Sequence, residues 1–103
     1  STSLIIAKSL LEKGAKLKTY DPKAMKNSKN EVNELLSCEN AYEACEHSNG
    51  LIIATEWNEF RALDLRKIKS LIINPVIFDL RNIYDSSEIS TLGIEYFGIG
   101  TQL

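Results

Sequence analysis

Apolar positions along the chain switch between helical spacing and short continuous runs. Residues 3–13 place their apolar side chains on one helical face, and Gly14 follows them, which predicts an amphipathic helix that ends there. Residues 16–20 alternate as a strand does and stop at Asp21-Pro22. Three further apolar runs predict strands at residues 51–55, 76–79 and 94–97.

Capping signals predict helices between these strands. Asn40 and Asp85 are each followed three residues later by a glutamate, which is the spacing of a capping box. Asp64 precedes a third apolar-periodic segment in the same way. Helix and strand therefore alternate four times, and this order predicts right-handed crossovers and a parallel sheet.

The alternation predicts an α/β domain of the Rossmann-like, three-layer kind with a mainly parallel sheet. A doubly wound unit normally begins on a strand, whereas this sequence begins on a helix, so we expect the domain to lack its first strand. Residues 51–55 show no alternation of polar and apolar positions, which is typical of a strand covered on both faces. A length of 103 residues favours a single domain, residues 1–103.

Charge and hydropathy exclude several classes of partner. Twelve basic residues nearly cancel fourteen acidic ones, so no overall field attracts nucleic acid or anionic lipid. No apolar run approaches the roughly 20 residues that a membrane span needs. We therefore expect a cytoplasmic domain. Three lysines, Lys23, Lys26 and Lys29, are compatible with a phosphate patch, but acidic residues follow directly and favour a solvated connection.

Neither cysteine lies in a pattern that predicts chemistry. Cys38 and Cys45 match neither a zinc spacing nor a redox motif. The single histidine, His47, is two residues from Cys45 and so on a different helical face. Gly98-Ile99-Gly100 lacks the third glycine and the following helix of a dinucleotide fingerprint. The sequence therefore predicts no metal site and no catalytic residue.

The segment 76–85 carries the best candidate for ligand binding. In open α/β sheets, ligands bind beyond the carboxyl ends of the strands, and Arg81 follows such an end directly. Its guanidinium is suited to phosphate because the planar fork donates two parallel hydrogen bonds. The alternative is that Arg81 pairs with Asp79 or Asp85 and only holds a loop.

Two aromatic residues follow the run 51–55. Trp57 and Phe60 are three positions apart and so lie on one side of a helical turn. They are compatible with core packing, with a subunit contact or with a ligand platform, and packing in the core or an interface is favoured. The nearby acids Glu56 and Glu59 are expected on a solvated surface rather than in acid–base chemistry.

Three ordered motifs carry a family resemblance. They are Gly14-Ala15 leading to Tyr20-Asp21-Pro22, then Ala54-Thr55-Glu56-Trp57 with Phe60-Arg61, and Asp79-Leu80-Arg81-Asn82 with Tyr84-Asp85. With these motifs the chain resembles the C-terminal, UDP-sugar-binding domain of the UDP-glucose/GDP-mannose dehydrogenase family, most closely the branch that acts on UDP-glucose. The similarity spans essentially all 103 residues.

The resemblance implies a fragment of a larger, homo-oligomeric dehydrogenase with a UDP-sugar substrate. Such enzymes oxidise the sugar 6-hydroxymethyl group to a carboxylate with two NAD, and the NAD site and catalytic cysteine lie outside this domain. Arg81 matches the family's substrate-binding arginine, and Asp79, Asn82 and Asp85 are expected to support it. Leu80 stands where the family usually has glycine, which would allow a positive φ.

Alternatives remain at this point. The substrate is UDP-glucose or another nucleotide sugar, such as UDP-N-acetylmannosamine or GDP-mannose. Two alternatives to a dehydrogenase domain are also open. One is a non-catalytic interaction module with Trp57 and Phe60 as its anchors, and the other is an unrelated α/β receiver or nucleotide sensor.

Overall fold

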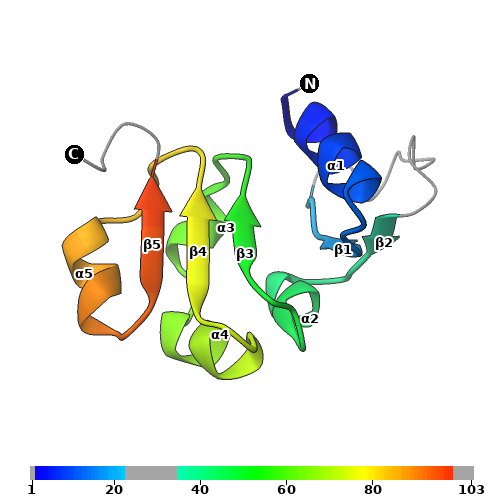
Figure 1. Cartoon of the computed structure of the whole chain (residues 1–103). Coiled ribbons are helices and arrows are strands. Elements are labelled where there is room, and N and C mark those ends of the chain that lie inside the picture. The colour runs from blue at the N-terminus through cyan, green and yellow to red at the C-terminus, as the bar shows by residue number, and fades with distance from the viewer. Residues whose placement is uncertain (1, 23–34, 99–103) are drawn as a thin grey trace. The chain divides into compact units, whose positions relative to one another are not determined.

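The computed structural model describes residues 2–22 and 35–98 of the chain, which divides into two compact units, residues 1–44 and 45–103 (Figure 1). The first unit contains α1 (Thr2–Glu12), β1 (Leu17–Thr19), β2 (Leu35–Ser37) and most of α2 (Ala41–Cys45). The second contains β3 (Leu51–Ile53), α3 (Asn58–Arg61), α4 (Leu65–Leu71), β4 (Val76–Asp79), α5 (Ser86–Thr91) and β5 (Glu95–Gly98). The lysines considered as a phosphate patch lie outside the described residues.

The first unit is a small parallel sheet with one long helix. Helix α1 ends as the sequence predicts, because Gly14 adopts a φ of 95° and its N–H donates to the carbonyl of Leu11 at 3.0 Å. Strands β1 and β2 pair in parallel, with Leu17 opposite Leu35. Strand β2 is not predicted from the sequence, because only Leu35 and Leu36 are apolar there and they directly follow a mostly polar segment.

Helix α2 begins at the predicted cap. The side-chain oxygen of Asn40 accepts the backbone N–H of Glu43 at 2.9 Å. The carboxylate of Glu43 accepts the N–H of Glu39 at 2.6 Å, one residue earlier than in the usual reciprocal pair. The first bond satisfies a backbone donor that the helix start leaves unpaired, and the second fixes the residue before the cap.

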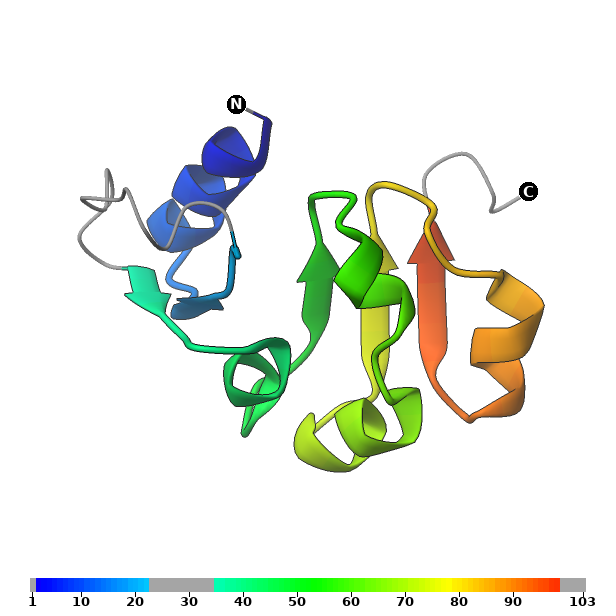
Figure 2. The ribbon, with the colours of Figure 1, turned by 180° about the vertical axis from the view of Figure 1, so that it is seen from behind.

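The second unit is a three-stranded parallel sheet in the order β3-β4-β5. This confirms the predicted α/β class with parallel strands. Helices α3 and α4 lie on one face of the sheet, in front of it in Figure 2, and α5 lies beside β5. The core of this unit includes Ile53, Ile68, Ile77, Ile89 and Ile94, all less than 5% exposed.

Side chains on the opposite face of this sheet are more exposed than the sequence suggests. Ile52, Phe78 and Phe97 are in register across the three strands and are 39%, 41% and 38% exposed. The rings of Phe78 and Phe97 stack with their centroids 5.3 Å apart. The expected cover on both faces of β3 is therefore not seen at Ile52.

The two remaining caps are also as predicted. Asp64 accepts the N–H groups of Arg66 and Lys67 at the start of α4. Asp85 accepts the N–H of Ser87 at the start of α5. Among the residues that the structure describes, no helix is long and apolar enough to cross a membrane.

Candidate functional site

Asp79, the last residue of β4, organises the loop that follows the strand. Its side chain is fully buried, and Oδ1 accepts the N–H of Arg81 at 3.0 Å. Oδ2 accepts the N–H groups of Ile83 at 2.8 Å and Tyr84 at 3.1 Å. A buried carboxylate is tolerated when such donors satisfy it, and here they fold residues 80–84 around the side chain.

A tyrosine from the neighbouring strand completes the shell of Asp79. The hydroxyl of Tyr96, on β5, donates to Oδ2 of Asp79 at 2.7 Å and lies 3.2 Å from the carbonyl of Tyr84. Burial, and then the hydrogen bond to the Asp79 carboxylate, raise the pKa of Tyr96. From the sequence Tyr96 fits the family pattern, but no site role is predicted for it. The register of β4 and β5 explains the contact. Gly98 lies opposite Asp79, and Tyr96, two residues before Gly98, points to the same face of the sheet as Asp79.

The loop's unusual backbone conformation is at Asn82 and not at Leu80. Asn82 has a φ of 54°, in the left-handed region that asparagine tolerates better than most residues. Leu80 has no positive φ, and its N–H donates to the carbonyl of Ile53 at 2.9 Å, which extends the contact between β3 and β4. The conformational freedom of a glycine is therefore not required at position 80 in this chain.

The guanidinium of Arg81 contacts a residue of the loop after β3. Its Nη2 donates to Oε1 of Glu56 at 3.0 Å, and both side chains are half exposed. From the sequence, Asp79 or Asp85 was the expected partner of the Arg81 guanidinium. Asp79 instead accepts the backbone N–H of Arg81. Glu56 is exposed as expected, yet it is engaged with Arg81 rather than only solvated. An exposed pair of this kind contributes only about 0.2–1 kcal/mol.

A second arginine ties the same two loops together. Nη1 of Arg61, on α3, donates to the carbonyl of Ile83 at 3.1 Å, and its Nη2 lies 3.9 Å from Oε2 of Glu56. The hydroxyl of Tyr84 donates to the carbonyl of Phe60. The sequence predicts Glu56 on a solvated surface and predicts no role for Arg61, although both belong to the second family-like motif.

The remaining sequence candidates occupy supporting places. Asp85 caps α5, and the hydroxyl and N–H of Ser87 hold the pKa of Asp85 below its usual value. Phe60 is 8% exposed and lies in the core, and Trp57 is part-buried at the start of α3. Contact of either residue with a second subunit stays a prediction.

Nucleophilic and metal chemistry find little support in the described residues. Cys38 and Cys45 are 3% and 1% exposed, and burial raises the pKa of the Cys38 thiol, which disfavours the reactive thiolate. No group of three or more His, Cys, Asp or Glu side chains in residues 2–22 and 35–98 is arranged to hold a metal ion.

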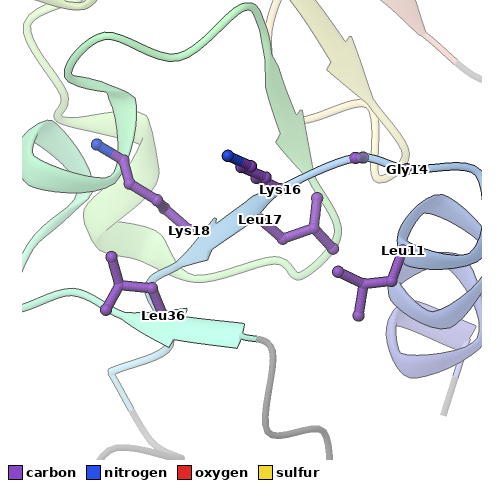
Figure 3. A pocket seen from close by; sticks show the side chains of 7 residues that line it. Leu11, Gly14, Lys16, Leu17, Lys18 and Leu36 are labelled. Atoms are coloured by element: carbon purple, nitrogen blue, oxygen red, sulfur yellow. The ribbon is translucent and has the colours of Figure 1, made fainter.

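A shallow hollow in the first unit is mainly apolar. Figure 3 shows Leu11, Leu17 and Leu36 on its walls, with Lys16 and Lys18 directed to one side of β1. Its volume is about 580 Å³. No acidic residue or histidine lines it, so it offers none of the groups that acid–base chemistry needs.

Comparison with known proteins identifies the family of the chain. Residues 1–86 match the model of the UDP-glucose/GDP-mannose dehydrogenase family, UDP binding domain. The chain belongs to this family. The matched span includes both Glu56 and Arg81 and ends before Tyr96.

Relatives from distant organisms show the same likeness along the chain. It is 43% identical to a UDP-glucose 6-dehydrogenase of Rickettsia bellii, with 100% of the chain and 24% of the relative covered. It is 39% identical to that of Rhizobium meliloti, over 97% of the chain and 23% of the relative. The corresponding enzyme of Gallus gallus is 34% identical over 100% of the chain and 24% of the relative. The chain thus spans about a quarter of the length of these relatives.

Proposed function

We propose that this chain binds the UDP part of a nucleotide sugar within a UDP-glucose 6-dehydrogenase, and that Arg81 donates hydrogen bonds to the diphosphate. The family membership supports a UDP ligand. The observation that carries the assignment to Arg81 is its position, because a half-exposed guanidinium stands directly beyond the carboxyl end of β4.

The geometry leaves Arg81 able to take an anionic ligand. Of its guanidinium nitrogens, Nη2 donates to Glu56, and half of the side chain is accessible to solvent. Asp79 accepts the backbone N–H of Arg81, and Asn82, directly after Arg81, adopts the left-handed conformation at which the loop turns. A charge-assisted hydrogen bond to a phosphate oxygen contributes about 1.5–3 kcal/mol.

The oxidation itself is assigned to parts of the enzyme outside this chain. A family enzyme that uses NAD needs a cradle for the dinucleotide pyrophosphate, which is normally a glycine-rich turn between a strand and a helix. Among the described residues, the segments that follow β1, β3 and β4 contain no glycine before the next element or gap. These residues do not fit NAD, so the proposal gives them no part in holding it or in hydride transfer.

Cytoplasmic location and assembly into a homo-oligomer complete the proposal. Cys38 and Cys45 are both free, as is usual in a reducing compartment, which supports the first. The second is what the family resemblance of the sequence implies. Light scattering of the intact enzyme measures its assembly directly, and Trp57→Ala is the variant that tests an aromatic anchor in a subunit contact.

Arg81→Ala in the intact enzyme tests the binding role. We expect the Kd for UDP to rise by roughly ten- to a hundredfold, since about 1.4 kcal/mol corresponds to a factor of ten. Arg66→Ala is the matched control because it removes an equally charged, exposed side chain from α4. Unchanged UDP affinity in Arg81→Ala, or equal losses in both variants, would contradict the proposal.

A further inference from the structure

The loops after β3 and β4 are joined by a closed ring of polar contacts. Arg81 and Ile83 lie in the loop after β4, and Glu56 and Arg61 come from the segment after β3. Arg81 contacts one carboxylate oxygen of Glu56, Arg61 approaches the other, and Arg61 also donates to the carbonyl of Ile83. The ring therefore begins and ends in the same short loop.

We propose that Glu56 is a positioning residue that orients the guanidinium of Arg81 for the phosphate groups of the nucleotide ligand. This inference rests on the proposed function. Long arginine side chains lose considerable rotamer freedom when they are fixed, and a ligand that meets an already oriented arginine does not bear that cost.

The geometry favours orientation by Glu56 over competition with the ligand. Glu56 contacts two cations, Arg61 and Arg81, so these three side chains together carry a net positive charge. The carboxylate of Asp79 is fully buried and accepts hydrogen bonds from backbone N–H groups and Tyr96 instead. The hydrogen bond from Arg81 to Glu56 uses Nη2, while a guanidinium carries five N–H donors in all. Arg61 in turn restrains Glu56 from the side of Oε2.

Glu56→Gln in the intact enzyme tests this role, because glutamine keeps the size of the side chain and removes its charge. We expect the Kd for UDP and the KM for the nucleotide sugar to rise about three- to fivefold, the effect of an exposed pair near the upper end of its range. We expect kcat to stay unchanged, since Glu56 acts on binding alone. The control is Glu59→Gln, which removes the same charge from the same segment. It should leave the Kd for UDP and the KM for the nucleotide sugar unchanged.

A double variant separates positioning from other effects. If Glu56 acts through Arg81, adding Glu56→Gln to Arg81→Ala causes no further loss of UDP affinity. An equal loss in both backgrounds overturns the inference, and so does tighter UDP binding by Glu56→Gln, which would mark Glu56 as a competitor of the ligand. If Arg81→Ala weakens binding but Glu56→Gln does not, only the positioning role fails. If Arg81→Ala has no effect, the proposed function fails and the positioning role fails with it.

Discussion

The hydroxyl of Tyr96 donates to Oδ2 of Asp79 at 2.7 Å across two neighbouring strands, although the residues are 17 positions apart in the sequence. The bond joins β5 to the carboxylate that folds the loop carrying Arg81. Tyr96, which has no part in ligand binding in the proposal, therefore supports the loop of Arg81 through Asp79.

Tyr96→Phe removes this hydrogen bond and little else. We expect the free energy of unfolding to fall by about 1.5 kcal/mol, the lower end of the range for a hydrogen bond to a charged group. Chemical denaturation of the intact protein measures the change. The control is Glu95→Gln, an exposed neighbour on the same strand, which should change stability little.

Alkaline pH should reveal the same contact. The pKa of Tyr96 is raised in the folded state by burial and by Asp79, so the unfolded chain loses this proton at lower pH than the folded chain does. The contribution of Tyr96 to stability is complete below pH of about 10, the ordinary tyrosine value, and is lost as the pH rises through the folded-state pKa. Above pH of about 10, the free energy of unfolding should therefore fall more steeply in the wild-type protein than in Tyr96→Phe. Parallel curves would contradict the assignment.

Asp79→Asn tests whether the carboxylate holds the loop. An amide has one acceptor oxygen, so either Arg81 on one side or Ile83, Tyr84 and Tyr96 on the other must face its NH₂ group. We expect a loss of about 1–3 kcal/mol of stability, as for unsatisfied buried polar groups. Faster hydrogen exchange at the amides of Arg81, Ile83 and Tyr84 should accompany it, and unchanged exchange there would exclude the role.

The strands and caps of the second unit were predictable, whereas the contacts between loops were not. Local signals suffice for Asp64 and Asp85, because a cap depends on residues two or three positions away. The partner of Arg81 is 25 positions distant, and nothing local distinguishes Glu56 from Asp79 or Asp85 as that partner. The position of Arg81 at the strand end followed from the apolar run alone, while the direction of its side chain required the tertiary structure.

Position 80, where this chain has leucine and the family usually has glycine, allows a test of the loop geometry. Leu80 does not adopt a positive φ, so Leu80→Gly should gain nothing from glycine's freedom. It should cost about 0.5–1 kcal/mol through the entropy of the unfolded chain, and more through the loss of a part-buried apolar side chain. At Asn82 the φ is positive, and Asn82→Gly should be tolerated, while Asn82→Val should cost about 1–2 kcal/mol. Denaturation of the three variants gives the ranking, and a stabilising Leu80→Gly would show that the strained position lies at residue 80.

Acid pH should weaken the start of α5 through Asp85. Its pKa is lowered first by the hydroxyl of Ser87 and then by the N–H of Ser87, so the ionised carboxylate is favoured in the folded state. Its contribution is present above the ordinary aspartate pKa of about 3.9 and is lost as the pH falls through the lower, folded-state value. The protection of the Ser87 amide, taken from its exchange rate relative to the intrinsic rate at the same pH, should therefore fall at acid pH in the wild-type protein. In Asp85→Asn, which retains a capping oxygen but does not titrate, this loss of protection should be absent, and its persistence would show that another group is responsible.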